Sequence, residues 1–183
     1  MRPTYRALCN INHPRIVASL SASIHELAKI LGPEITAEDL LSSFDEYIAG
    51  SDDGKTKVLA GLPTFVSNLP LAQSVALLNE LSAMWKGGSL PNWHHRESLA
   101  SHFAALLRHM ASQQMTQPVL DLVRLGLFDT FQAIREATIA NVSLGSVHDM
   151  SLLVLMLLLS GYRCRLVTKL FKVTRLRRRR CWV

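Results

Sequence analysis

The sequence predicts an all-α protein, an α-α superhelix (solenoid) of about three to four helical pairs. Apolar residues recur at helical spacing through most of its 183 residues. Glycines, prolines and short polar runs separate these stretches. A polar-then-basic pattern also returns about every 40 residues, which is the repeat length of HEAT/ARM-type helical pairs.

The first two expected helices lie on either side of Gly32-Pro33, because Gly followed by Pro is a common helix end. One apolar face of the first helix consists of Leu20, Ile24, Leu27, Ala28 and Leu31. Thr36 is expected to cap the second helix together with Asp39, in an approximate capping box. The apolar stripe of that helix covers residues 40–48.

Five further helices are expected, joined by short polar turns. The apolar positions of the first lie within 58–69, and Pro63 is expected to kink this helix. The second begins at Pro70 and ends near residue 85, before a loop at 86–92. The apolar positions of the others lie within 99–110, 118–127 and, after a turn at Asp129-Thr130, 131–142, where Phe131 is expected to face the core.

A basic residue recurs near the start of the second helix of each expected pair. Lys55, Arg96 and Arg135 lie 41 and 39 residues apart. The polar residues expected to cap these helices are Asp52 or Asp53, Asn92 and Asp129. The helix at Leu20 is expected to be the second helix of an earlier, incomplete pair. One helical hairpin cannot bury both its faces, so successive pairs are expected to stack on one another. The acids and bases near the turns are expected mainly to cap helices and to bridge the stacked pairs.

The net charge of +6 is unevenly distributed. Nine of the 20 Lys and Arg residues, and no acid, lie in 163–183, so residues 1–162 carry a net charge of −3. The three cysteines form no CxxC pair, which favours free thiols in a reducing compartment. A cytoplasmic protein is therefore expected, with the nucleus as an additional location.

We divide the chain into an N-terminal extension (1–15), the solenoid (16–142) and an atypical tail (143–183). The tail contains an apolar run at 152–159, too short to span a bilayer, and the block Arg177-Arg178-Arg179-Arg180. Three interpretations stay open for the tail: a final helix with a basic arm, a segment that binds anionic lipid or nucleic acid or directs nuclear import, or non-native sequence.

Three groups of stretches, 23–40, 92–100, and 122–129 with 133–137, carry a family resemblance. They resemble the HEAT-repeat regulatory subunits of protein phosphatase 4, which are similar to the scaffold subunit of protein phosphatase 2A. The resemblance covers about residues 16–142 of a chain far shorter than a full scaffold subunit. It implies a non-catalytic regulatory or scaffolding subunit whose partner is a Ser/Thr phosphatase catalytic subunit.

In that family, the turns inside the repeats form a ridge that contacts partners. Carried over to this sequence, the ridge consists of Asp52, Asp53, Lys55, Trp85, Lys86, Asn92, Trp93, Arg96, Asp129 and Arg135. Trp85 and Trp93 flank one loop, and two interpretations stay open for them: packing at the repeat junction, or exposed anchors for a partner.

Catalytic and metal chemistry is not expected. His94, His95 and His102 lie close in sequence but form no HExxH motif, and no GxSxG, P-loop or GxGxxG motif occurs. We therefore expect no cofactor and no small-molecule substrate. The alternative function is a generic HEAT-repeat adaptor whose basic tail contacts membrane or nucleic acid.

Overall fold

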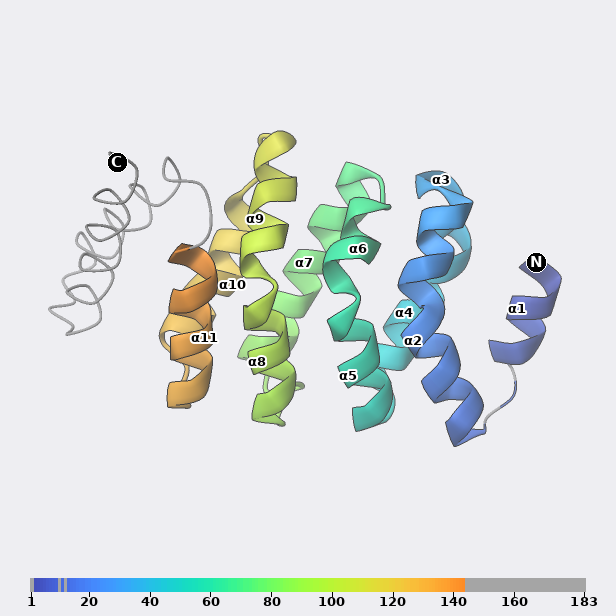
Figure 1. Ribbon diagram of the computed structural model, residues 1–183, viewed down its shortest axis with the longest axis horizontal. Helices are drawn as coiled ribbons and strands as arrows, with labels where there is room; N and C mark the ends of the chain where they lie inside the picture. Colours follow the sequence, from blue (N-terminus) through green and yellow to red (C-terminus); the bar gives the residue numbers. More distant parts are fainter. Residues whose placement is uncertain (1, 10, 12, 144–183) are drawn as a thin grey trace, which may run out of the picture.

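The computed structural model describes residues 2–9, 11 and 13–143, and this part of the chain is all-α. The helices form two rows (Figure 1). One row contains α2 (Pro14–Leu31), α5 (Asp52–Ala60) with α6 (Leu62–Ser67), α8 (Trp93–Ser101) with α9 (Phe103–Ser112), and α11 (Gln132–Ser143). The other contains α3 (Pro33–Ile35), η1 (Thr36–Leu40), α4 (Leu41–Ala49), α7 (Leu71–Lys86) and α10 (Gln117–Leu127). Helix α1 (Arg2–Cys9) packs beside α2.

The rows form a helical solenoid of the HEAT/ARM type, as the sequence predicts. Three pairs are complete: α4 with α5 and α6, α7 with α8 and α9, and α10 with α11. Within the first row, α2 packs on α5, α5 on α8, and α8 on α11. Helix α2 thus occupies the place of a second helix, as expected for an incomplete preceding pair.

A single apolar core runs through the described pairs. Phe44 of α4 stacks on Phe65 of α6, with ring centroids 4.7 Å apart. In the second pair, Trp85 of α7 stacks on Phe103 of α9, with ring centroids 6.5 Å apart. Full burial of such a side chain contributes about 1.5–3 kcal/mol relative to exposure. No described helix has the length and apolar content that a membrane crossing would require.

The predicted capping box at Thr36 is wrong. The helix already begins at Pro33, and Thr36 is the first residue of a π-helical segment, where it is fully buried. Its hydroxyl donates a hydrogen bond to the Ala28 carbonyl at 3.4 Å. Thr36 therefore joins this helix to α2, a contact between helices that a local capping pattern does not reveal.

The second helices of the first two complete pairs are both broken in the middle. The predicted kink near Pro63 is confirmed: α5 ends at Ala60, and Pro63 lies in the first turn of α6. A Cβ at Gly61 would overlap the His25 ring of α2, so the break also allows a close approach. The single helix predicted for 99–110 is wrong, because it breaks at His102 into α8 and α9.

Two local predictions near the turns are also wrong. Asp52 and Asp53 do not cap α5; they form its first turn, and Ser51 is the cap, accepting a hydrogen bond from the Gly54 N–H at 3.3 Å. Phe131 does not face the core; it precedes α11 and is 45% exposed. The proposed boundaries at 15 and 143 stay predictions, and residues 144–183 of the tail lie outside the described residues.

Candidate functional site

The three turns inside the helical pairs lie along one edge of the solenoid. They connect α4 to α5, α7 to α8 and α10 to α11, at the lower edge in Figure 1. We call this the turn edge; it is formed by residues 50–55, 85–96 and 128–135. All ten predicted ridge residues lie on it, because the chain returns to the same edge once in each pair.

Asp52 joins the first turn to the second. Its carboxylate accepts a hydrogen bond from the Asn92 amide at 3.2 Å, and its carbonyl lies 3.2 Å from His95 Nε2. Asn92 also caps α8, because its side-chain oxygen accepts from the His94 N–H at 3.1 Å. One side chain therefore both starts a helix and contacts the preceding pair, as the spacing of these residues predicts.

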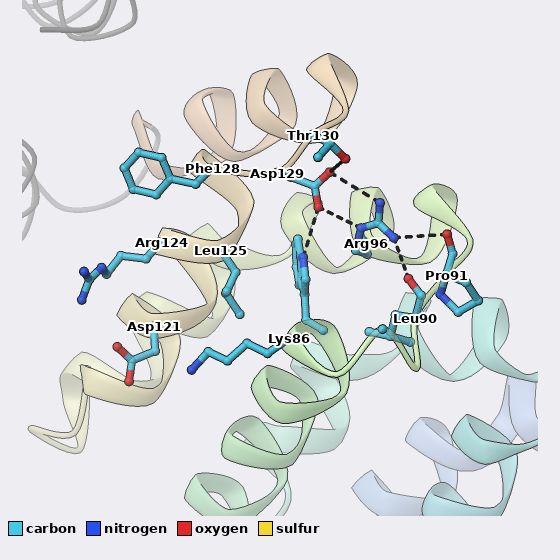
Figure 2. Close-up of a pocket in the computed structure, with 12 residues that line it drawn as sticks. Lys86, Leu90, Pro91, Arg96, Asp121, Arg124, Leu125, Phe128, Asp129 and Thr130 are labelled. Carbon is cyan, nitrogen blue, oxygen red and sulfur yellow. Dashed lines mark hydrogen bonds and ion pairs between the residues drawn. The ribbon is translucent and has the colours of Figure 1, made fainter. Parts of the chain in front are cut away.

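Asp129 joins the third turn to the second through a more buried contact. Its carboxylate accepts from Arg96 Nε at 2.9 Å and from the Trp85 indole N–H at 3.1 Å. The side chains of Arg96 and Asp129 are only 11% and 5% exposed. Arg96 also donates to the carbonyls of Leu90, at 2.6 Å, and Pro91, at 3.2 Å. Arg96 thus fixes the α7–α8 loop and the α10–α11 turn at once (Figure 2).

The third turn is closed by its own polar contacts. The Phe131 N–H donates to the Asp129 carboxylate at 2.9 Å. Arg135 donates to the carbonyls of Asp129, at 2.7 Å, and Thr130, at 2.8 Å. Arg135 therefore contacts the carbonyls six and five residues before it, as Arg96 does with Leu90 and Pro91, and Arg96 contacts the next turn in addition.

The surroundings of Asp129 set its charge. Burial alone would raise the pKa of this carboxyl group, but the hydrogen bonds from Phe131, Arg96 and Trp85 and the positive charge of Arg96 together hold the pKa below its usual value. Asp129 is therefore ionised at neutral pH, and its charge is paired with that of Arg96.

The ten predicted residues differ in exposure. The side chains of Trp85, Arg96 and Asp129 are buried or nearly so and hold the turns in place. Asp52, Asp53 and Lys86 are exposed, and the half-buried residues are Lys55, Asn92, Trp93 and Arg135. For Trp85 the packing interpretation is therefore confirmed, while Trp93 stays available at the surface.

An aromatic group extends the turn edge beyond the predicted residues. Trp93 stacks on Phe131, with ring centroids 6.0 Å apart and an interplanar angle of 11°. The Arg96 guanidinium lies 5.4 Å from the Phe131 ring centroid, a cation–π contact. The helical pattern places Phe131 in the core by spacing alone, and only its position before the true start of α11 reveals its exposure.

The sequence also gave no indication of an open groove of about 660 Å³ beside the turn edge. It lies between the end of α7, the α7–α8 loop and the last turns of α10 (Figure 2). Trp85 and Asp129 line its inner side, and Lys86, Asp121 and Arg124 are among the polar residues that line it. Residues of α10 were not singled out, because nothing in its helical pattern distinguishes this face from others.

The histidines that could suggest a metal site have other contacts. His95 is buried against Asp52, and His94 Nδ1 lies 3.7 Å from Glu97 Oε2. Burial lowers the pKa of His102, at the break between α8 and α9. Among the described residues, no three His, Cys, Asp or Glu side chains are grouped so as to hold a metal ion.

Comparison with known proteins supports the resemblance carried by the three sequence stretches. Each match to serine/threonine-protein phosphatase 4 regulatory subunit 1 from Homo sapiens, Mus musculus and Rattus norvegicus is 32% identical over 107 residues. The chain is similar to phosphatase 4 regulatory subunit 1. The match covers 58% of this chain but 11% of the length of each phosphatase 4 regulatory subunit. No protein-family model and no solved structure matches the chain.

Proposed function

We propose that this chain is a non-catalytic regulatory element that binds a Ser/Thr protein phosphatase catalytic subunit, of the phosphatase 4 type, along its turn edge. The observation that carries the proposal is the 32% identity to proteins named as phosphatase 4 regulatory subunits. A solenoid is suited to this role, because it presents an extended, rigid series of turns to a partner.

The exposure of the turn-edge residues divides their roles in this proposal. Arg96, Asp129 and Trp85 hold the turns in a fixed geometry and have little surface left for a partner. Lys55 and Trp93 have accessible surface; Trp is among the residue types that contribute most to binding, and Lys55 offers a positive charge to an acidic partner. The element would then act by positioning the catalytic subunit relative to its substrates.

The test is direct binding of the full chain to purified phosphatase 4 catalytic subunit, measured by biolayer interferometry. The variant Lys55→Glu/Trp93→Ala changes one charge and removes one aromatic side chain at the turn edge. The control, Arg108→Glu/Met115→Ala, makes a matched change near the end of α9, at the opposite edge (Figure 1). Circular dichroism checks that all three chains are folded.

We expect the turn-edge variant to weaken binding at least tenfold, roughly the effect of removing one interface anchor. The opposite-edge variant should bind within about twofold of the parent. No binding by the folded parent chain would contradict the partner, and an equal effect of both variants would contradict the turn edge. Phosphoester hydrolysis by the purified chain alone would contradict the non-catalytic role.

A further inference from the structure

The groove beside the turn edge combines positive charge with an apolar surface. Lys86 is the last residue of α7, and Arg124 lies in the last turn of α10. Both are exposed, and neither makes a hydrogen bond or ion pair with another residue that the structure describes. Figure 2 shows the charged ends of both side chains pointing away from the Arg96–Asp129 pair. Their N–H donors are therefore available to an acidic ligand.

The apolar part of the groove consists of Leu90, Leu125 and Phe128. Phe128 is 48% exposed, a large fraction for an aromatic side chain at a turn. Beneath them, Trp85 is fixed by its hydrogen bond to Asp129. A ligand therefore meets a surface that is already ordered, and little side-chain entropy is lost when it binds.

The size and charges of the groove favour a peptide over a polyanion. About 660 Å³ accommodates a few amino-acid residues. Asp121 lines the same groove; its carboxylate accepts a hydrogen bond from Gln117 at 3.1 Å and makes no ion pair with Lys86. This negative charge opposes a continuous phosphate backbone, but Lys86 and Arg124 together outnumber it, so the groove still favours a ligand with a carboxylate.

We propose that the groove binds a short acidic segment of a partner protein, in which a carboxylate contacts Lys86 and Arg124 and an adjacent bulky apolar side chain packs on Leu125 and Phe128. The groove shares Lys86, Leu90 and Phe128 with the turn edge but contains neither Lys55 nor Trp93, the two residues changed in the phosphatase test. The inference therefore does not depend on the phosphatase proposal, and the two can fail independently.

The probe is a fluorescein-labelled peptide with the sequence Glu-Phe-Glu-Leu in a Gly/Ser frame. The control peptide has the same sequence with Gln in place of both Glu residues. Binding to the full chain is followed by fluorescence anisotropy, and by the indole ¹H–¹⁵N resonance of Trp85, assigned with Trp85→Phe. This resonance reports on the groove, because the Trp85 N–H donates to Asp129 and both residues line the groove. The basic segment 163–183 can also attract acidic peptides, so binding is assigned to the groove only when the change at Trp85 requires Lys86 and Arg124.

The variant Lys86→Gln/Arg124→Gln removes both cations, while Arg15→Gln/Arg108→Gln removes two exposed cations elsewhere and gives the same net charge. We expect the groove variant to bind the acidic peptide about tenfold more weakly, and the control within about twofold of the parent. The Trp85 resonance should shift with the acidic peptide in the parent and the control only. All chains should keep the melting temperature of the parent.

Four results would overturn the inference. These are the absence of binding at millimolar peptide, equal binding of the Gln peptide, equal affinity in both double variants, and an unchanged Trp85 resonance. A single-stranded oligonucleotide that displaces the peptide, shifts the Trp85 resonance and requires the same two cations would also overturn it, because it would show a nucleic-acid site.

Discussion

At the scale of single residues, Asp129 combines the largest number of contacts on the turn edge. It accepts from a backbone N–H, an indole and a guanidinium, and its side chain is 5% exposed. Without its carboxylate, the nearly buried charge of Arg96 would lose its ionised partner and retain the Leu90 and Pro91 carbonyls and the Phe131 ring. We expect Asp129→Ala to lower the free energy of unfolding by about 2–3 kcal/mol. Urea denaturation followed by circular dichroism measures this change.

Asp121→Ala is the matched control, because its carboxylate makes only a local hydrogen bond to Gln117. It should cost less than about 0.5 kcal/mol. The folded pKa of Asp129 is lowered, so its contribution is present above the unfolded pKa of about 4 and is lost as the pH falls through the folded value. The difference between parent and Asp129→Ala should therefore be smaller at pH 3 than at pH 7. An undiminished difference would show that the charge of Asp129 is not what stabilises the turn.

At the scale of helices, the contact between α10 and α11 depends on a residue with no side chain. A Cβ at Gly126 would overlap Thr138 Oγ1 and lie 3.2 Å from a Phe103 ring carbon. Ala is favoured over Gly in a helix by about 1 kcal/mol, but overpacking costs about 1–3 kcal/mol. We expect Gly126→Ala to lower the free energy of unfolding by about 1 kcal/mol.

A double-mutant cycle identifies the cause of this loss. Thr138→Ala removes the side chain that a Cβ at position 126 would overlap, so Gly126→Ala should cost less in the Thr138→Ala background. Thermal unfolding of the four proteins gives the coupling. Equal costs in both backgrounds would show that the two helices do not approach as closely as described.

Helix positions were more predictable from the sequence than helix interruptions. The apolar periodicity places every long helix of the described solenoid, and the spacing of Lys55, Arg96 and Arg135 identifies the second helix of each complete pair. The break at His102 carries neither Gly nor Pro, so no local pattern indicates it. The burial of Thr36 similarly depends on α2, which a local capping pattern ignores.

The same limit applies to the candidate site. The sequence predicts which residues share the turn edge, because they occupy equivalent positions in successive repeats. It does not distinguish Arg96, which is nearly buried, from Lys55, which keeps accessible surface, because that difference depends on the next turn. The groove was not predictable, since it lies between the ends of α7 and α10, about 40 residues apart in the chain.

At the scale of the whole described molecule, each pair contacts only its neighbours, so stability is expected to vary along the solenoid. Asp129 lies in the third pair and contacts the second, far from α2 and α5. In Asp129→Ala, amide hydrogen exchange should accelerate more in α10 and α11 than in α2 and α5. Mass spectrometry of peptic fragments measures this at neutral pH. Equal acceleration throughout would show that the solenoid opens as a single unit.

The contacts of Asp52 with Asn92, and of Asp129 with Arg96 and Trp85, all lie on the turn edge. Each of these contacts joins one helical pair to the next on the same side of the solenoid. At the opposite edge, the chain itself connects successive pairs, and buried hydrogen bonds run from Thr36 to the Ala28 carbonyl and from Ser74 to the Val66 carbonyl. Successive pairs are therefore held together at both edges, and a partner that binds across several turns would meet a surface whose spacing is already fixed.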